Sequence, residues 1–174
     1  LIAGALYIAG LVRLHRRGDH WPVLRTVSWM AGLAVVIWCT NSGVSIYAQV
    51  SVGMHMLQHM TITMLAPIFL VMGAPATLAL RALKPAPGNE RGPREWLVWF
   101  LHSWITRILT NPFYVFFIYV IGLYGLYFTP AFGWLMGSHV GHVVMQVHFI
   151  VSGYLFYWVL IGIDPGPQRW SPLM

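Results

Sequence analysis

Residues 53–80 read GMHMLQHMTITMLAPIFLVMGAPATLAL and contain no Lys, Arg, Asp or Glu. An uncharged apolar stretch of this length exceeds the roughly 20 residues that a helix needs to cross the hydrocarbon core of a bilayer. Two histidines, His55 and His59, lie near its beginning, whereas Pro67 and the run 73–75 (GAP) lie further along. We therefore predict a membrane-spanning helix that carries imidazoles near one end and is interrupted toward the other.

The rest of the chain has the composition of a membrane protein. Hydrophobic residues make up 58% of the 174 residues and charged residues only 8%, against about 25% charged in an average soluble domain. Four further apolar segments are predicted to be helical, at residues 1–12, 27–49, 112–128 and 138–163. We expect an all-α polytopic helix bundle of about five transmembrane segments, the first one truncated. Residues 1–174 are predicted to form a single membrane domain that is a fragment of a longer chain.

The charged residues predict how the bundle is oriented. The ten basic residues lie in the loops 13–25 and 81–107 and at Arg169, whereas the connections 40–54 and 129–138 carry no formal charge. The positive-inside rule places the basic loops on the cytoplasmic side and the histidine pairs near the extracytoplasmic face. The net charge of +6 then reflects orientation and contact with the lipid bilayer, so no nucleic-acid partner is expected.

Residues 95–109 show a different pattern from the spans. Trp96, Trp99 and Trp104 alternate with polar residues such as His102. Tryptophan is enriched at membrane–water interfaces, and an amphipathic helix with such anchors lies in the plane of the interface. We predict one interfacial amphipathic helix here.

Two pairs of histidines occupy the predicted outer ends of two helices. His55 and His59 are four residues apart, so one face of a helix presents both imidazoles. His139 and His142 are three residues apart at a matching depth of the last helix, and His148 lies deeper and is rotated from them. Ionisable groups inside a membrane are costly and tend to mark functional sites. These five histidines are predicted metal ligands, with a separate role open for His148.

The residues around the first pair indicate which metal fits. Met56 and Met60 form a second pair with a spacing of four residues, and thioether with imidazole favours Cu(I). The predicted outer side has no carboxylate, which argues against hard cations and against hydrolytic catalysis. We predict a copper-binding protein that is not an enzyme. Zinc, haem b held by one histidine from each of two helices, and a structural scaffold whose histidines only bridge helices are the alternatives, and Cys39 is predicted to pack structurally.

Two segments also carry a family resemblance. Residues 55–60 (HMLQHM) and 65–75 (LAPIFLVMGAP) resemble the signature of the bacterial polytopic CtaG-type cytochrome c oxidase assembly factors. Residues 142–165 are similar to that family's second motif, and together the resemblance covers most of residues 27–165. It implies a multi-pass protein of the bacterial plasma membrane that delivers copper to a cytochrome c oxidase subunit in the respiratory chain. The histidines that match the family by position are His55, His59, His142 and His148.

Overall fold

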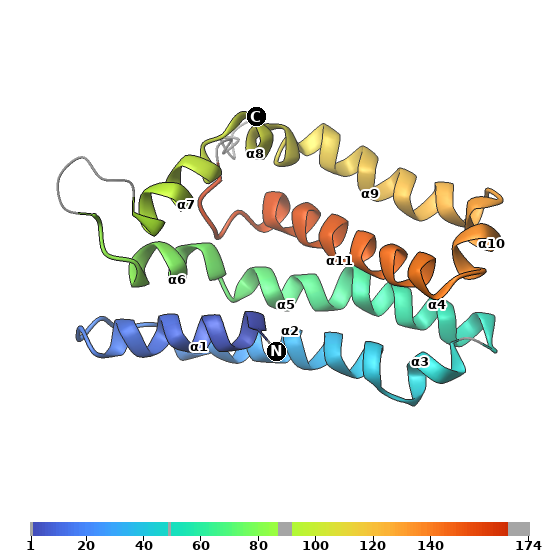
Figure 1. Cartoon of the computed structure of the whole chain (residues 1–174), viewed down its shortest axis with the longest axis horizontal. Helices are drawn as coiled ribbons and strands as arrows, with labels where there is room; N and C mark the ends of the chain where they lie inside the picture. Colours follow the sequence, from blue (N-terminus) through green and yellow to red (C-terminus); the bar gives the residue numbers. More distant parts are fainter. Residues whose placement is uncertain (1, 49, 87–91, 167–174) are drawn as a thin grey trace.

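The computed structural model describes residues 2–48, 50–86 and 92–166, and within these residues it contains helices and no strand. Figure 1 shows long helices that lie side by side along the longest axis of the molecule, with shorter helices where the chain turns. The prediction of an all-α bundle is confirmed. The elements in chain order are α1 (Ile2–His15), α2 (Val23–Asn41), α3 (Gly43–Tyr47), α4 (Val52–Met60), the π-helical turn η1 (Thr61–Leu65), α5 (Ala66–Met72), α6 (Pro75–Ala82), α7 (Pro93–Leu101), α8 (Trp104–Leu109), α9 (Pro112–Tyr127), α10 (Ala131–Met136) and α11 (His139–Ile161).

Three helical segments of the described chain are long and apolar enough to cross a membrane. They are Val23–Asn41, Val52–Ala82, which runs from α4 through α6, and Val140–Ile161. The apolar helices α1 and α9 contain 14 and 16 residues. At about 1.5 Å per residue both are shorter than the roughly 30 Å hydrocarbon core. The structure therefore supports a membrane protein with three candidate spans, where the sequence predicted about five.

The middle span is interrupted twice, and Pro67 explains the first interruption. Proline has no backbone N–H and cannot donate to the carbonyl four residues earlier, which belongs to Thr63. Over Thr61–Leu65 the backbone bonds widen to π-helical spacing, in which the N–H of Ala66 donates to the carbonyl of Thr61. The Thr63 carbonyl lies against Gly153 of α11, where a Cβ atom would collide with it. The absence of a side chain at Gly153 thus lets α11 pack directly on the π-helical turn.

The second interruption separates α5 from α6 and is held by a buried carboxylate. Ala74 has a left-handed backbone with φ of 48°, and Pro75 begins α6. Asp164 is only 2% exposed, and its oxygens accept hydrogen bonds from the N–H of Ala76 at 3.2 Å and of Thr77 at 2.8 Å. The Thr77 hydroxyl donates a third bond at 2.6 Å. A carboxylate from the segment after α11 therefore caps the first turn of α6.

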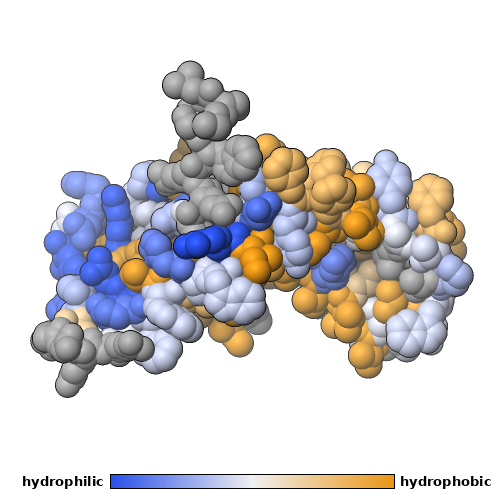
Figure 2. Space-filling view, turned by 90° about the horizontal axis from the view of Figure 1, so that it is seen from above, coloured by the Kyte–Doolittle hydropathy of each residue, from blue (hydrophilic) through white to orange (hydrophobic). Residues whose placement is uncertain are grey.

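The same end of the bundle carries the charged side chains. The Tyr7 hydroxyl donates to the carbonyl of Gly73 at 2.9 Å, and Trp21 Nε1 donates to the Tyr7 oxygen at 3.2 Å. The guanidinium of Arg17 donates to the carbonyl of Arg81. Figure 2 shows hydrophilic residues gathered toward this end and hydrophobic residues over much of the remaining surface. We call this end, with the loops that follow α1 and α6, the basic end. We call the opposite end, around α3, α4 and α10, the uncharged end.

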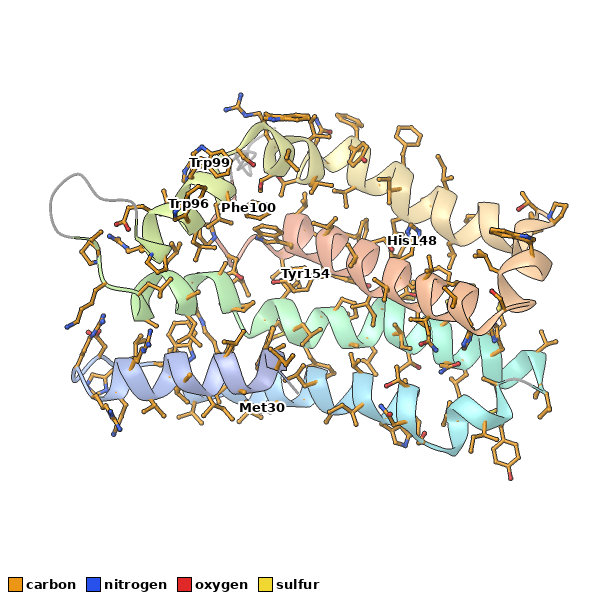
Figure 3. All side chains as sticks on the ribbon, in the orientation of Figure 1. Met30, Trp96, Trp99, Phe100, His148 and Tyr154 are labelled. Atoms are coloured by element: carbon orange, nitrogen blue, oxygen red, sulfur yellow. The ribbon has the colours of Figure 1, made fainter. Side chains whose placement is uncertain are left out.

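Two predicted segments differ from the structure, and a serine explains each difference. The span predicted over residues 27–49 ends at Asn41, because Ser42 has an extended backbone and its side chain caps the new helix α3 by accepting from Val44 N–H. The single helix predicted over residues 95–109 is instead α7 and α8, and the Ser103 side chain caps α8 by accepting from Thr106 N–H. Hydrogen bonds between a serine side chain and the backbone compete in this way with the backbone hydrogen bonds that would continue the helix. Figure 3 shows Trp96 and Trp99 on α7, with their ring centroids 5.7 Å apart.

Candidate metal centre

The first helix of the middle span contributes two imidazoles to the interior of the uncharged end. His55 and His59 lie one turn apart on α4 and are 2% and 1% exposed. Their ring centroids are 4.3 Å apart. The spacing of four residues places both rings on the same helix face, as predicted. This part of α4 contacts α2 through Gln58 and Cys39 and α11 through His59 and Phe149.

A third imidazole comes from α11. The ring centroid of His142 lies 5.8 Å from that of His55 and 5.9 Å from that of His59. One ligand atom from each of the three histidines can be chosen so that all three lie within 4.8 Å of one another. Imidazole nitrogens bound to a single zinc-sized ion at about 2.0–2.1 Å lie roughly 3.3–3.6 Å apart. Small side-chain rotations would therefore let the three rings share one ion, and we call His55, His59 and His142 the histidine triad.

The position of His142 is set by contacts of α11 on either side of it in the sequence. Near the triad, the Ser138 side chain caps α11 by accepting from the Gly141 N–H at 3.0 Å. A Cβ atom at Gly141 would collide with the carbonyl of Leu135, so the connection from α10 passes very close to the helix. Further along, Gly153 contacts the π-helical turn that follows His59. These contacts hold His142 opposite the α4 pair.

The hydrogen bonding around His59 differs from that of an ordinary buried side chain. Within the described part of the chain, neither ring nitrogen of His59 has a hydrogen-bond partner. The neighbouring Gln58 is fully buried, and its Nε2 donates to the Cys39 carbonyl at 2.7 Å. Its Oε1 accepts no hydrogen bond from a described residue. Buried polar groups are nearly always hydrogen-bonded, because an unpaired one costs about 1–3 kcal/mol. The two ring nitrogens of His59 are thus not engaged by other described residues, and either one could serve as a ligand atom.

An apolar floor lies beneath the triad. The ring centroid of Phe149 on α11 is 4.9 Å from that of His59. Phe149 belongs to a buried cluster with Cys39, Ile62 and Met145. The Cys39 sulfur packs in this cluster and is not among the grouped metal-ligand atoms. The floor closes the site toward the middle of the bundle, which limits the access of water from that side.

The other predicted ligands lie elsewhere. Met56 and Met60 are 42% and 40% exposed, on the neighbouring face of α4. His148 is an exposed residue of α11, and a Cβ atom built at Gly122 of α9 would lie 2.5 Å from its Nε2. Figure 3 shows His148 between α9 and α11. His139 begins α11, but its side chain lies outside the described residues. The structure therefore brings together three of the five predicted histidines and leaves the two methionines on an exposed surface.

Three residues that shape the site were not among the predicted ligands, although each lies in one of the two family-like segments. Gln58 is a polar residue within an apolar span, one position before His59, and that placement was an available signal. Phe149 and Gly153 lie in the second family-like segment, residues 142–165, but their residue types indicated no role in a site, because an aromatic residue and a glycine are unremarkable within an apolar helix. Their importance depends on how α11 packs against the middle span.

The donor set limits the chemistry of the site. Three neutral imidazoles suit copper and zinc, whereas Ca²⁺ and Mg²⁺ require oxygen ligands. The triad contains no carboxylate to act as a general base, and hydrolytic catalysis normally uses one. The arrangement is suited to holding an ion of copper or zinc type between two helices.

The fold and the site thus define a class: a helical membrane protein with a histidine triad between two of its candidate spans, in which His55 and His59 are buried and His142 is partly buried. The chain belongs to the cytochrome c oxidase caa3 assembly factor family (Caa3_CtaG), whose family model matches residues 5–174. The family resemblance of the two sequence segments is confirmed.

Similar chains occur in mycobacteria. The uncharacterized protein ML1998 of Mycobacterium leprae is 46% identical over 170 residues, which cover 97% of this chain and 26% of the relative. The uncharacterized proteins Mb0105 of Mycobacterium bovis and MT0111 of Mycobacterium tuberculosis are each 48% identical over 165 residues, which cover 94% of this chain and 25% of each relative. The chain therefore spans about a quarter of the length of these relatives. No solved structure matches it.

Proposed function

We propose that this chain is the copper-holding part of a membrane assembly factor for haem–copper cytochrome c oxidase. In this proposal copper is cargo, which the histidine triad binds and passes to an oxidase subunit, and no catalytic turnover is involved. The observation that carries the proposal is the triad itself, in which three imidazoles from two helices offer ligand atoms within 4.8 Å of one another. The family match supplies the oxidase as the partner.

The transfer step follows from the ligands that surround the triad. In this proposal copper is bound by the imidazoles of His55, His59 and His142 and by no carboxylate of the protein. Each copper–imidazole bond can then be replaced in turn by a bond to a ligand of the acceptor. Met56 and Met60 lie on the next face of α4 and are partly exposed. We propose that their soft thioethers assist Cu(I) while it enters or leaves the triad rather than while it rests there.

The side of the membrane on which transfer occurs follows from the distribution of charge. The triad lies toward the uncharged end, whereas the arginine-rich loops lie at the other end. By the positive-inside rule we propose a multi-pass arrangement in the plasma membrane with the basic loops cytoplasmic and the triad near the extracytoplasmic face. Copper and the acceptor subunit would then bind the protein at its extracytoplasmic face.

The alternative of a haem-b-binding electron carrier is disfavoured by the packing of the three rings. A haem held between α4 and α11 would need a flat apolar slot between one imidazole of each helix. The centroids of His59 and His142 are 5.9 Å apart, and His55 lies 4.3 Å from the first and 5.8 Å from the second. The third ring therefore occupies space that a porphyrin would need, and the crowding favours a single ion.

The proposal is tested by loading the detergent-purified protein with Cu(I) under reducing conditions, followed by elemental analysis and an optical spectrum. The wild type is compared with the double variant His55→Ala/His59→Ala. The matched control is His15→Ala/His20→Ala, which removes two exposed histidines at the basic end. We expect about one copper per chain in the wild type and in the control, and none in the triad variant.

Two outcomes would overturn the assignment. Copper content that is unchanged in His55→Ala/His59→Ala would exclude the triad as the copper site. A Soret band that is present in the wild type and lost in that variant would instead move the function to haem.

A further inference from the structure

A cavity of about 480 Å³ opens between the end of α1 and the start of α2, at the basic end. Leu11, Val12 and Val23 form an apolar wall, and Arg16 and Asp19 also line the cavity. Arg16 follows the last residue of α1, so it lies roughly 6–8 Å further along the helix direction than Leu11. The apolar wall therefore lies along the two helices, and the two charged residues lie toward the loop that joins them, at the side of the cavity that we call its mouth. The cavity is remote from the histidine triad.

The two charges at the mouth are opposite, yet they are not paired with each other. Arg16 and Asp19 are both exposed, and the described residues contain no ion pair between them. Gly18, with φ of 77°, lies in the turn that follows α1, between Arg16 and Asp19. Because neither side chain neutralises the other, a guanidinium and a carboxylate are both available to a ligand.

We propose that this cavity binds one phospholipid whose headgroup carries a primary ammonium, the class of phosphatidylethanolamine. Its acyl chain would pack on the apolar wall, its phosphate would accept hydrogen bonds from Arg16, and its ammonium would donate to the Asp19 carboxylate. Both contacts are charge-assisted, which makes them stronger than neutral hydrogen bonds. The order of groups from interior to mouth matches the order of groups along such a lipid.

Trp21 supports a lipid rather than a soluble ligand at this place. Its indole lines the cavity, and indoles are enriched at the headgroup level of membranes. Trp21 Nε1 donates to the Tyr7 hydroxyl at 3.2 Å, and the guanidinium carbon of Arg25 lies 5.2 Å from the centroid of its ring. The wall is thereby held in place before a lipid arrives.

The two charges also select among headgroups. A phosphatidylglycerol headgroup offers no cation to Asp19 and brings a net negative charge toward that carboxylate. A phosphatidylcholine headgroup carries a cation without N–H donors, so it cannot hydrogen-bond to Asp19. Both lipids keep the phosphate contact to Arg16. Asp19 is therefore the residue that determines selectivity, and Arg16 contributes to the binding of all three lipids.

The test measures lipid binding to the purified protein by native mass spectrometry, with phosphatidylethanolamine, phosphatidylcholine and phosphatidylglycerol of identical acyl chains added singly. It is run on residues 1–174. We expect phosphatidylethanolamine to bind at least about fivefold more tightly than the other two lipids, which corresponds to a difference of about 1 kcal/mol in the free energy of binding. Asp19→Asn should abolish this preference, and Arg16→Gln should weaken the binding of all three lipids. Arg13→Gln, which removes an exposed charge of α1 that does not line the cavity, should change neither.

Three results would overturn the proposal. Equal or tighter binding of phosphatidylglycerol would show a general attraction of anionic lipid to the basic end. A preference that survives Asp19→Asn would place the lipid elsewhere. Lipid binding that Arg16→Gln does not weaken would place the phosphate away from this cavity. Because all three variants are at exposed positions, none of them is expected to prevent folding.

Discussion

Asp164 at the basic end and His59 at the uncharged end are both almost completely buried, but their hydrogen bonding is opposite. At the basic end, Asp164 is 2% exposed and accepts three hydrogen bonds from Ala76 and Thr77. At the uncharged end, His59 is 1% exposed, yet neither of its ring nitrogens is hydrogen-bonded to a described residue. The first arrangement stabilises the fold, whereas the second costs stability in the absence of a ligand. The comparison indicates that Asp164 holds α6 and the segment after α11 together, whereas the unpaired ring of His59 fits the proposed role in binding an ion.

The largest loss of stability is expected for Asp164→Ala. This change leaves the N–H groups of Ala76 and Thr77 without their acceptor and opens a small cavity between α6 and α11. We expect a loss of about 3 kcal/mol in the free energy of unfolding, measured by denaturant or thermal unfolding in detergent. Thr77→Val removes only the hydroxyl bond and should cost about 1 kcal/mol. Equal effects of the two variants would contradict the role of Asp164 as the cap of α6.

A somewhat smaller loss is expected for Gly153→Ala. The added methyl would collide with the Thr63 carbonyl and lie 3.0 Å from Pro67, so α11 must move away from the π-helical turn. Overpacking of this kind typically costs about 1–3 kcal/mol. Because α11 carries His142, copper affinity should fall as well. The control is Gly133→Ala in α10, where no atom lies within 4 Å of the added methyl. A copper affinity that is equal in the two variants would show that the contact does not position His142.

His59→Leu should separate binding from stability. The change replaces an unsatisfied buried ring with an apolar side chain, so the stability of the metal-free protein should change by less than about 1 kcal/mol or even rise. In the wild type, copper at 100 times its dissociation constant should stabilise the protein by about 2.7 kcal/mol. That stabilisation should vanish in the variant. A strong destabilisation of the metal-free variant would show that His59 is hydrogen-bonded within the fold and has a structural role.

The smallest effect is expected for Met56→Leu and Met60→Leu. Both side chains are about two-fifths exposed, so the substitutions should change stability by less than about 0.5 kcal/mol. At equilibrium they should leave the copper content unchanged, while the rate of copper transfer to a competing Cu(I) chelator falls. Loss of bound copper at equilibrium would instead make the thioethers part of the resting site.

Much of the fold could be predicted because apolar length and charge decide it. The apolar stretches 112–128 and 138–163 correspond to α9 and α11, and the proline and glycine signals in residues 53–80 mark the two interruptions of the middle span. The break at Ser42 was not predicted, because a serine can either remain within a helix or cap a new one. Hydrogen bonding in the folded chain decides between these two outcomes.

The candidate site could be predicted in part. The spacing of His55 and His59 fixes their common face, and the depth of His142 suggested that it would meet them. The orientation of Met56 and Met60 could not be predicted, because every face of this span is apolar enough to be buried or to face lipid. The role of Gly153 depends on the π-helical turn, which arises from Pro67 together with the packing of α11.

The central claim is that three imidazoles and no sulfur hold the ion, and X-ray absorption spectroscopy at the copper edge tests it most directly. The protein is loaded with one equivalent of Cu(I), and the spectrum is compared with that of His142→Ala. We expect three nitrogen neighbours with the scattering pattern of imidazole in the wild type and a reduced number in the variant. Sulfur neighbours in the wild type, or a copper environment that His142→Ala does not alter, would contradict the histidine triad as the metal centre.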